Sequence, residues 1–288
     1  MTGQSVAPRS TPLARLARLV RFAGHFVRMH GEAAWTFPRR SPRERRRLVA
    51  DWAARTLDVL NVRVLVRGDV PWRDAPILIV ANHISWLDVH ALSTVNGARF
   101  VAKSEVRDWP LVGALAARCG TFFIARGSCR AAWRTKNEIA TALQQGDPVV
   151  IFPEGTTTDG RRVRPFYPAL LQAAVDSRCA VHPVTIRYQT AGGSGNEAAA
   201  FLGDMSFARS LLRILREPVM TVEVTFGRPI AARNRTRREL AALAQLAITE
   251  TLALPPPARP ALESSHGIDS SRSRPRIGLP PSRAAAPA

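Results

Sequence analysis

The sequence predicts an α/β fold, in which a β-sheet is covered by α-helices on both faces. The first observation is a series of short apolar, strand-like runs, near residues 62–66, 76–81, 99–102, 121–125, 148–152, 181–187 and 219–226. The second is that helical stretches lie between and after these runs, near residues 89–96, 110–118, 129–145, 167–177, 206–215 and 235–253. Strands that alternate with helices in this way are typical of an α/β sheet.

A basic amphipathic helix is expected over residues 13–30, ahead of the first strand. One face of this helix would be apolar, with Leu13, Leu16, Leu19, Val20, Ala23, Phe26 and Val27. The roughly opposite side would be basic, with Arg15, Arg18, Arg21, His25 and Arg28, and Phe22 interrupts the pattern. Such a helix fits a membrane interface, but it also fits a helix that packs on the domain with a solvated basic face.

A second helix is expected to begin at Ser41 and to run to about Leu60. Ser41-Pro42-Arg43-Glu44 combines a serine cap, a proline at the first helical position and a glutamate at the third. Residues 1–60 are therefore interpreted as a helical, membrane-associating segment. Residues 255–288 are rich in Pro, Ser, Arg and Ala without periodicity, and they are expected to form a disordered tail.

The positive charge of the chain is concentrated at its ends. The formal net charge is +19, of which residues 1–68 contribute +10, residues 69–228 only +4 and residues 229–288 +5. Basic ends on a nearly balanced centre suggest an anionic partner surface, either lipid or nucleic acid. No window of about 18 consecutive apolar residues is present, so no ordinary membrane-spanning helix is expected.

Redox, metal and nucleotide chemistry find little support in the sequence. Cys119, Cys129 and Cys179 lie in apolar surroundings and are interpreted as reduced core residues. There is no zinc-ligand spacing, no phosphate-binding Gly-x-x-x-x-Gly-Lys loop and no dinucleotide glycine fingerprint. We therefore expect neither a metal nor a cofactor.

A histidine and an aspartate follow the second apolar run. The segment Asn82-His83-Ile84-Ser85-Trp86-Leu87-Asp88 comes directly after residues 76–81. A pair of this kind can take a proton from a hydroxyl group, with His83 as the base and Asp88 as its orienting charge partner. The alternative is that both residues are ordinary polar groups of a turn and a helix cap. Asn82 is expected to cap the following helix.

Three later runs also end or begin at polar or turn-forming residues. Gly120-Thr121-Phe122-Phe123-Ile124-Ala125-Arg126 ends in an arginine, Phe152-Pro153-Glu154-Gly155-Thr156 closes the strand-like run that begins at Pro148, and His182-Pro183-Val184-Thr185-Ile186 opens another. Strand ends are where open α/β sheets build their sites. In this order and at these spacings, the four blocks resemble the glycerolipid acyltransferases, the family of 1-acyl-glycerol-3-phosphate acyltransferases, over about residues 60 to 230.

The resemblance implies a fold, a reaction and a location. The fold would be a mixed, largely parallel sheet flanked by helices and preceded by N-terminal amphipathic helices, with the acyltransferase domain at residues 61–254. The reaction would move an acyl group from acyl carrier protein or coenzyme A to a lysolipid hydroxyl, with the thioester as co-substrate and no nucleic acid as partner. The location would be the cytoplasmic face of a bacterial inner membrane, with the protein peripheral or monotopic.

The resemblance also assigns residues to the site. His83 and Asp88 match the catalytic pair of the family, and Arg126 matches an arginine associated with the phosphate of the acceptor. Further acceptor-binding candidates are Lys103, Glu154, Gly155 and Thr156. Gly155 would permit a tight turn, while Glu154 would either bind acceptor hydroxyls or hold loop amides.

One position departs from the pattern of the family. Many members that form phosphatidate continue the third block as Gly-Thr-Arg-Ser, whereas Thr157 stands here where that arginine is common, and Arg161, Arg162 and Arg164 come only later. The acceptor favoured by the resemblance is 1-acyl-glycerol-3-phosphate (lysophosphatidate), which would give phosphatidic acid. Lyso-ornithine lipid, which carries no phosphate, is the main alternative acceptor.

Two other classes of protein compete with an acyltransferase. A basic protein that binds membrane or nucleic acid without catalysis would use the charge, but it gives no role to a His/Asp pair in the nearly neutral centre. A serine hydrolase would require a Gly-x-Ser-x-Gly turn, and the sequence contains none.

Overall fold

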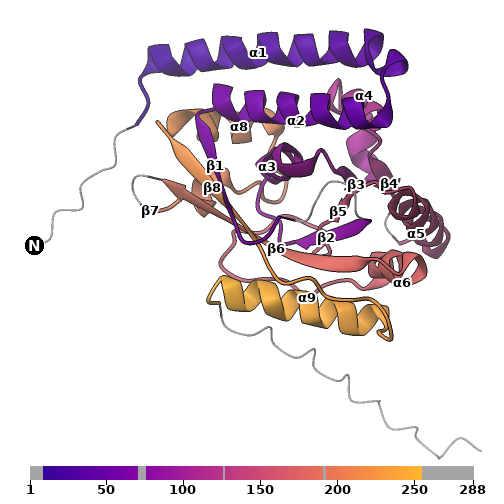
Figure 1. Ribbon diagram of the computed structural model, residues 1–288. Helices are drawn as coiled ribbons and strands as arrows, with labels where there is room; N and C mark the ends of the chain where they lie inside the picture. Colours follow the sequence, from indigo (N-terminus) through magenta and orange to yellow (C-terminus); the bar gives the residue numbers. More distant parts are fainter. Residues whose placement is uncertain (1–8, 71–75, 126, 191–192, 255–288) are drawn as a thin grey trace, which may run out of the picture. The chain divides into compact units, whose positions relative to one another are not determined.

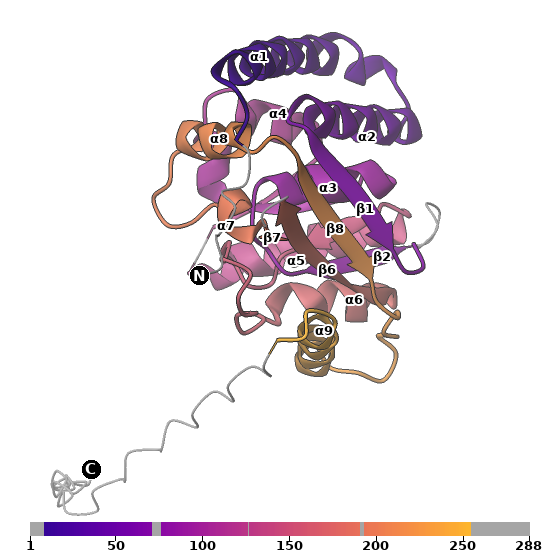
Figure 2. The same cartoon turned by 90° about the vertical axis from the view of Figure 1, so that its left-hand side faces the viewer.

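A mixed, largely parallel sheet forms the centre of the protein (Figures 1 and 2). The computed structural model describes residues 9–70, 76–125, 127–190 and 193–254. The strands are β1 (Val62–Arg67), β2 (Ile77–Ala81), β3 (Arg99–Lys103), β4 (Phe122–Ile124), β5 (Val149–Ile151), β6 (Ala180–Thr190), β7 (Gly193–Ser194) and β8 (Met220–Phe226). Their order in the sheet is β1-β8-β6-β2-β5-β3-β4, with β7 paired to β6. The fold class expected from the sequence is confirmed.

The direction of the strands changes on one side of the sheet. The pairs β1/β8, β6/β2, β2/β5, β5/β3 and β3/β4 are parallel, whereas β6 runs antiparallel to both β8 and β7. All five residues of β2 are buried, as expected for a central strand covered on both faces. Because β2 and β5 are parallel neighbours, His83 after β2 and Glu154 after β5 lie at the same edge of the sheet.

Helices cover both faces of the sheet. They are α1 (Pro12–Trp35), α2 (Pro42–Val59), α3 (Leu87–Asn96), α4 (Val112–Arg118), α5 (Cys129–Gln144), α6 (Gln172–Ser177), α7 (Asn196–Ala199), α8 (Phe207–Arg216) and α9 (Arg237–Thr251). Single 3₁₀ turns span Phe37–Arg39, Ser104–Asp108 and Ala169–Leu171. One apolar core joins the sheet to α2, α3 and α8, and a second joins its other face to α5, α6 and α9.

The predicted elements are present, with small differences in their bounds. The helix expected over 167–177 is divided into a 3₁₀ turn and α6, and the short elements β7 and α7 were not expected. The cap predicted for α2 is confirmed, because Ser41 accepts from the Glu44 amide while Glu44 accepts from the Ser41 amide at 2.8 Å. The tail predicted over 255–288 lies outside the described residues.

Helix α1 packs on the domain with a face different from the predicted apolar one. Its buried residues are Arg18, Phe22, Met29 and Ala33, so Phe22, which interrupts the predicted apolar face, marks the side that is packed. Several residues of that predicted face point outward instead, among them Leu13 at 77% and Val27 at 73% exposure. None of the helices in the described part of the chain is long and apolar enough to cross a membrane.

The buried guanidinium of Arg18 explains how a basic residue can lie on the packed side of α1. It donates hydrogen bonds to the carbonyl oxygens of Leu215, at 3.3 Å, and Glu217, at 2.9 Å, and also to that of Leu60. These carbonyls lie at the C-terminal ends of α8 and α2, where helices leave acceptors without an intrahelical partner. Arg18 therefore joins three helices through charge-assisted hydrogen bonds.

Replacing Arg18 should destabilise the protein much more than replacing its neighbour Arg21. Arg18→Ala leaves the buried carbonyl of Leu60 without this donor, whereas Leu215 O keeps the hydrogen bond from the Ser10 hydroxyl, and we expect the free energy of unfolding to fall by about 1–3 kcal/mol. Arg21→Ala is the control, because Arg21 only approaches Asp58 at 3.8 Å between two exposed side chains, and it should change stability by less than about 0.5 kcal/mol. Urea denaturation measures both, and equal losses would contradict the role given to Arg18.

Candidate active site

The segment that carries His83 begins where the β2 backbone ends. The side chain of Asn82 continues the sheet there, because its amide donates to Ile186 O at 3.0 Å and its carbonyl accepts from Ile186 N at 2.8 Å. The expectation that Asn82 caps the following helix was wrong, since α3 begins at Leu87 with Trp86 at the cap position. An asparagine side chain offers one donor and one acceptor, like a peptide group, and here it fastens the loop to β6.

His83 and Asp88 form the pair that the sequence predicted. His83 Nδ1 lies 2.8 Å from Asp88 Oδ2, and the Asp88 side chain is fully buried. The same oxygen accepts from the backbone amides of Ile84, at 2.7 Å, and Ser85, at 2.9 Å. The imidazole also stacks on Phe152, with ring centroids 3.9 Å apart and planes at 12°. Since Nδ1–H donates its hydrogen bond to the carboxylate, Nε2 carries the free lone pair and is the nitrogen that can act as a base.

The backbone of His83 is held from the third block. Glu154 accepts from the His83 amide at 2.8 Å and from the Arg164 amide at 2.9 Å, one bond to each carboxylate oxygen. The carbonyl oxygen of His83 accepts from the amide of Thr158 at 2.7 Å and from its hydroxyl at 3.2 Å. Of the two roles open for Glu154 in the sequence, the structure therefore supports holding loop amides.

Burial dominates the electrostatics of Glu154. Only 2% of this residue is exposed, and desolvation raises the pKa of its carboxyl group to about 7, with the nearby charge of Asp88 acting in the same direction. The two amide hydrogen bonds oppose this shift. Glu154 is therefore a buried group that changes its charge near neutral pH.

The remaining predicted site residues are Gly155, Thr156, Lys103 and Arg126. Gly155 has a φ of +66°, a left-handed conformation that favours glycine, and the half-buried Thr156 follows it in the same loop. Lys103 is the last residue of β3, which is separated from β2 by β5. Arg126 lies outside the described residues.

The position that departs from the pattern of the family, Thr157, is bound to a neighbouring loop. Its hydroxyl donates to the carbonyl oxygen of Phe201, and the amide of Phe201 donates to Ile84 O at 3.0 Å. The arginines that follow in the sequence, Arg161, Arg162 and Arg164, are exposed. Through Phe201, the threonine of the third block is thus linked to the segment 82–88 that carries His83.

Sequence reasoning missed Tyr188, which belongs to the same hydrogen-bond network. Tyr188 is fully buried in β6, and its hydroxyl donates to Asp88 Oδ1 at 2.5 Å. A usable signal was present, because a tyrosine in a buried strand normally finds a partner for its hydroxyl. The sequence does not say which group that partner is, since 100 residues separate Tyr188 from Asp88.

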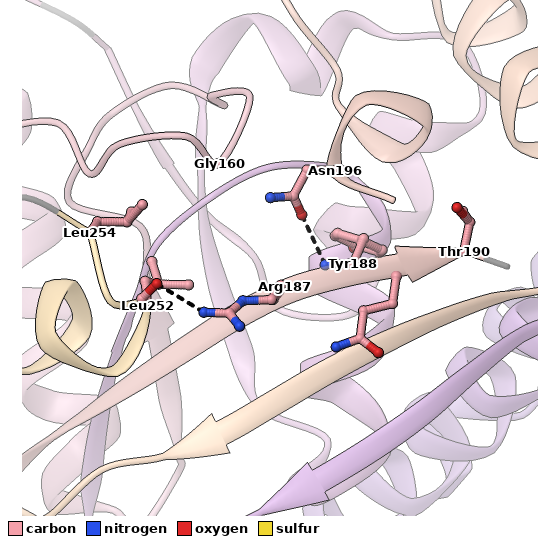
Figure 3. Close-up of a pocket in the computed structure, with 8 residues that line it drawn as sticks. Gly160, Arg187, Tyr188, Thr190, Asn196, Leu252 and Leu254 are labelled. Carbon is pink, nitrogen blue, oxygen red and sulfur yellow. Dashed lines mark hydrogen bonds between the residues drawn. The ribbon is translucent and has the colours of Figure 1, made fainter. Parts of the chain in front are cut away.

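Tyr188 is also one of the residues that line a cavity of about 510 Å³ (Figure 3). Gly160, Arg187, Asn196 and Leu252 are among its lining residues, and the Arg187 guanidinium donates to Leu252 O at 3.0 Å. His83 does not line this cavity, so we assign it no part in the chemistry of the pair. Within the described ranges, no three His, Cys, Asp or Glu side chains are grouped as a metal site would require.

Comparisons with known proteins identify the family. The family model described as Acyltransferase matches residues 63–187. A lyso-ornithine lipid O-acyltransferase of Pseudomonas aeruginosa is 39% identical over 240 residues, which cover 81% of this chain and 91% of that protein. A 1-acyl-sn-glycerol-3-phosphate acyltransferase of Neisseria meningitidis is 33% identical over 185 residues, covering 64% and 72%.

A solved structure has the same fold. It is the 1-acyl-sn-glycerophosphate acyltransferase of Thermotoga maritima, which superposes with a TM-score of 0.65 at 21% sequence identity. The match covers 84% of this chain and 94% of that one.

Proposed function

This chain belongs to the acyltransferase family, and from that premise we propose that it transfers an acyl group from an acyl thioester to the free hydroxyl of a lysolipid. The resemblance drawn from the four sequence blocks is confirmed by these matches. The observation that carries the proposal is the 2.8 Å contact between His83 Nδ1 and the buried carboxylate of Asp88. It prepares a histidine to take a proton from a hydroxyl that the substrate itself brings.

In the proposed reaction, every proton and bond is accounted for by the two substrates and His83. Nε2 of His83 removes the hydroxyl proton as the oxygen attacks the thioester carbonyl, and Asp88 stabilises the imidazolium that forms. The tetrahedral intermediate then collapses, the carbon–sulfur bond breaks, and the imidazolium returns its proton to the leaving thiolate. The products are an ester on the acceptor lipid and a free thiol. The thiol belongs to acyl carrier protein or coenzyme A.

For the acceptor, we propose lyso-ornithine lipid. The sequence alone favoured lysophosphatidate, but the relative that matches over 91% of its length is named for lyso-ornithine lipid. The bonding of Thr157 supports the same choice, because its hydroxyl is tied to Phe201 where an arginine would add a cation for phosphate. Lysophosphatidate stays the second candidate, on the strength of the relative from Neisseria meningitidis.

We further propose that the protein works at a membrane surface, on the cytoplasmic face of a bacterial inner membrane. Helix α1 presents outward an apolar stripe, defined here as Leu13, Leu16, Val20, Val27 and Trp35, all exposed. Exposed arginines such as Arg21 and Arg28 lie on the same helix, and residues 1–68 carry a net charge of +10. Apolar side chains beside arginines suit an interface with anionic headgroups.

Replacing His83 should abolish most of the activity. General-base catalysis contributes roughly 10²- to 10⁴-fold, so His83→Ala should lower kcat by at least about 100-fold in an acyl-transfer assay. Asp88→Asn should also be severe, because the amide can stabilise the wrong tautomer of the imidazole. Circular dichroism controls for folding, and a folded His83→Ala enzyme with near-normal turnover would exclude this mechanism.

The acceptor assignment can be tested by competition between two lysolipids. We expect kcat/KM for lyso-ornithine lipid to exceed that for lysophosphatidate by more than about tenfold, a difference of roughly 1.4 kcal/mol in transition-state binding. Thr157→Arg should move this ratio toward lysophosphatidate by supplying a cation for its phosphate. A wild-type preference for lysophosphatidate of the same size would reverse the assignment.

Charge placed on the apolar stripe should weaken binding to membranes. The double variant Leu16→Asp/Val20→Asp should float less with anionic vesicles than wild type, and wild-type binding should fall as salt screens the headgroups. Leu246→Asp is the matched control, because Leu246 is an exposed leucine on α9, in the helix layer on the opposite face of the sheet. Equal flotation of all three proteins would mean that the stripe does not contact the membrane.

A further inference from the structure

We propose that Tyr188 is a positioning residue for the His83–Asp88 pair. Its hydroxyl fixes the orientation of the Asp88 carboxylate and sets how tightly the pair holds a proton. This inference rests on the proposed catalytic role of His83 and Asp88.

The hydrogen bonds to Asp88 are divided between its two oxygens. Oδ2 accepts from His83 Nδ1 and from the amides of Ile84 and Ser85, all within the same short segment of chain. Oδ1 accepts from Tyr188 Oη at 2.5 Å. A carboxylate bonded at both oxygens cannot rotate without breaking a bond, so Tyr188 keeps Oδ2 directed at the imidazole.

The surroundings of Tyr188 keep it a hydrogen-bond donor. Burial and the negative charge of Asp88 raise the pKa of the Tyr188 hydroxyl well above its ordinary value. The side chain of Ser85 also hydrogen-bonds to Tyr188. The phenol therefore stays protonated and oriented at every pH at which the enzyme is expected to work.

The backbone of Tyr188 is held by two residues that follow β7, Gly195 and Asn196. The Tyr188 amide donates to Asn196 Oδ1 at 2.9 Å, as Figure 3 shows, and the Gly195 amide donates to Tyr188 O at 2.9 Å. Gly160, with a φ of +71°, packs on this anchor so closely that an added Cβ would lie 2.5 Å from Asn196 Nδ2 and 2.9 Å from Ile84 Cδ1. The backbone that carries the Tyr188 hydroxyl is thus held by residues outside the segment 82–88.

A donor on Oδ1 changes how strongly Asp88 stabilises the imidazolium. The hydrogen bond from Tyr188 draws negative charge away from Oδ2, so the proton on His83 is held less tightly and is released more readily to the leaving thiolate. Among the residues that the structure describes, the other titratable groups hydrogen-bonded to His83 or Asp88 are Tyr188 and Glu154, and Glu154 accepts from the His83 amide. Glu154 also titrates near neutral pH, so the pKa read from a single pH profile does not belong to His83 alone. The direction in which the profile moves between variants is therefore the informative quantity.

Tyr188→Phe removes the hydroxyl and keeps the ring. We expect kcat to fall by about tenfold or more with KM within about twofold, and the acidic limb of the kcat/KM profile to move to higher pH. Thr249→Val is the control, because it deletes a buried hydroxyl on α9 that donates to Gln245 O at 2.8 Å. It should leave kcat and the pH profile of the enzyme unchanged.

A second experiment strengthens the hydrogen bond instead of deleting it. The chain contains only two tyrosines, Tyr167 and Tyr188. In a Tyr167→Phe background, biosynthetic incorporation of fluorotyrosine therefore modifies Tyr188 alone, and fluorination makes the phenol a stronger donor. Compared with the same background made with ordinary tyrosine, the acidic limb should move to lower pH, opposite to Tyr188→Phe. A packing role for the ring would not produce opposite shifts.

The outcomes separate this inference from the function on which it rests. If His83→Ala is inactive while Tyr188→Phe keeps the wild-type kcat and pH profile, the positioning role is wrong and the catalytic pair stands. A raised KM with unchanged kcat would also overturn the positioning role. If Tyr188→Phe does not fold, the fluorotyrosine protein decides, and an unchanged acidic limb overturns the inference. Activity in His83→Ala would instead refute the proposed function.

Discussion

The buried carboxylate of Asp88 is the point on which the geometry of the site depends. Removing an ionised carboxylate from water is costly unless hydrogen bonds replace its solvent. Among the described residues, His83, Ile84, Ser85 and Tyr188 supply these bonds. Three of them come from the turn between β2 and α3, so the turn is shaped by the same interaction that orients the histidine. The fourth comes from β6, and it ties the turn to the centre of the sheet.

The length of β6 makes that fourth bond possible. β6 lies parallel to β2, and its side chains at Val184, Ile186 and Tyr188 point into the core that also contains α3. The strand continues past the end of β2, since its last residues pair with β7 and β8 instead. This extension carries Tyr188 over the segment that follows β2. The strand expected from the sequence ends at residue 187, one residue short of the tyrosine.

Local patterns in the sequence predicted the strands except β7, the helices except α7, and the His83–Asp88 pair, because alternation, caps and strand ends are short-range features. Interactions across the fold could not be predicted in this way. Asn82 looked like a helix cap but bonds to Ile186, and Arg18 looked like part of a solvated basic face but binds carbonyls of α2 and α8. In each case a polar side chain satisfies backbone groups that only the folded chain brings near. Residue type alone does not reveal such partners.

Helix α1 connects the proposed membrane surface to the turn between β2 and α3, which carries His83. Its inner side places Phe22 edge-on against Trp86, with ring centroids 6.3 Å apart, and Trp86 donates to Ser210 Oγ at 3.0 Å on α8. Trp86 stands two positions before Asp88 in the chain. Arg18 directs its guanidinium inward, to carbonyl oxygens at the ends of α2 and α8. One helix therefore packs against the turn that carries His83 with one face and presents its apolar stripe with the other, so the two faces can be tested separately by point substitutions but not by removing the helix.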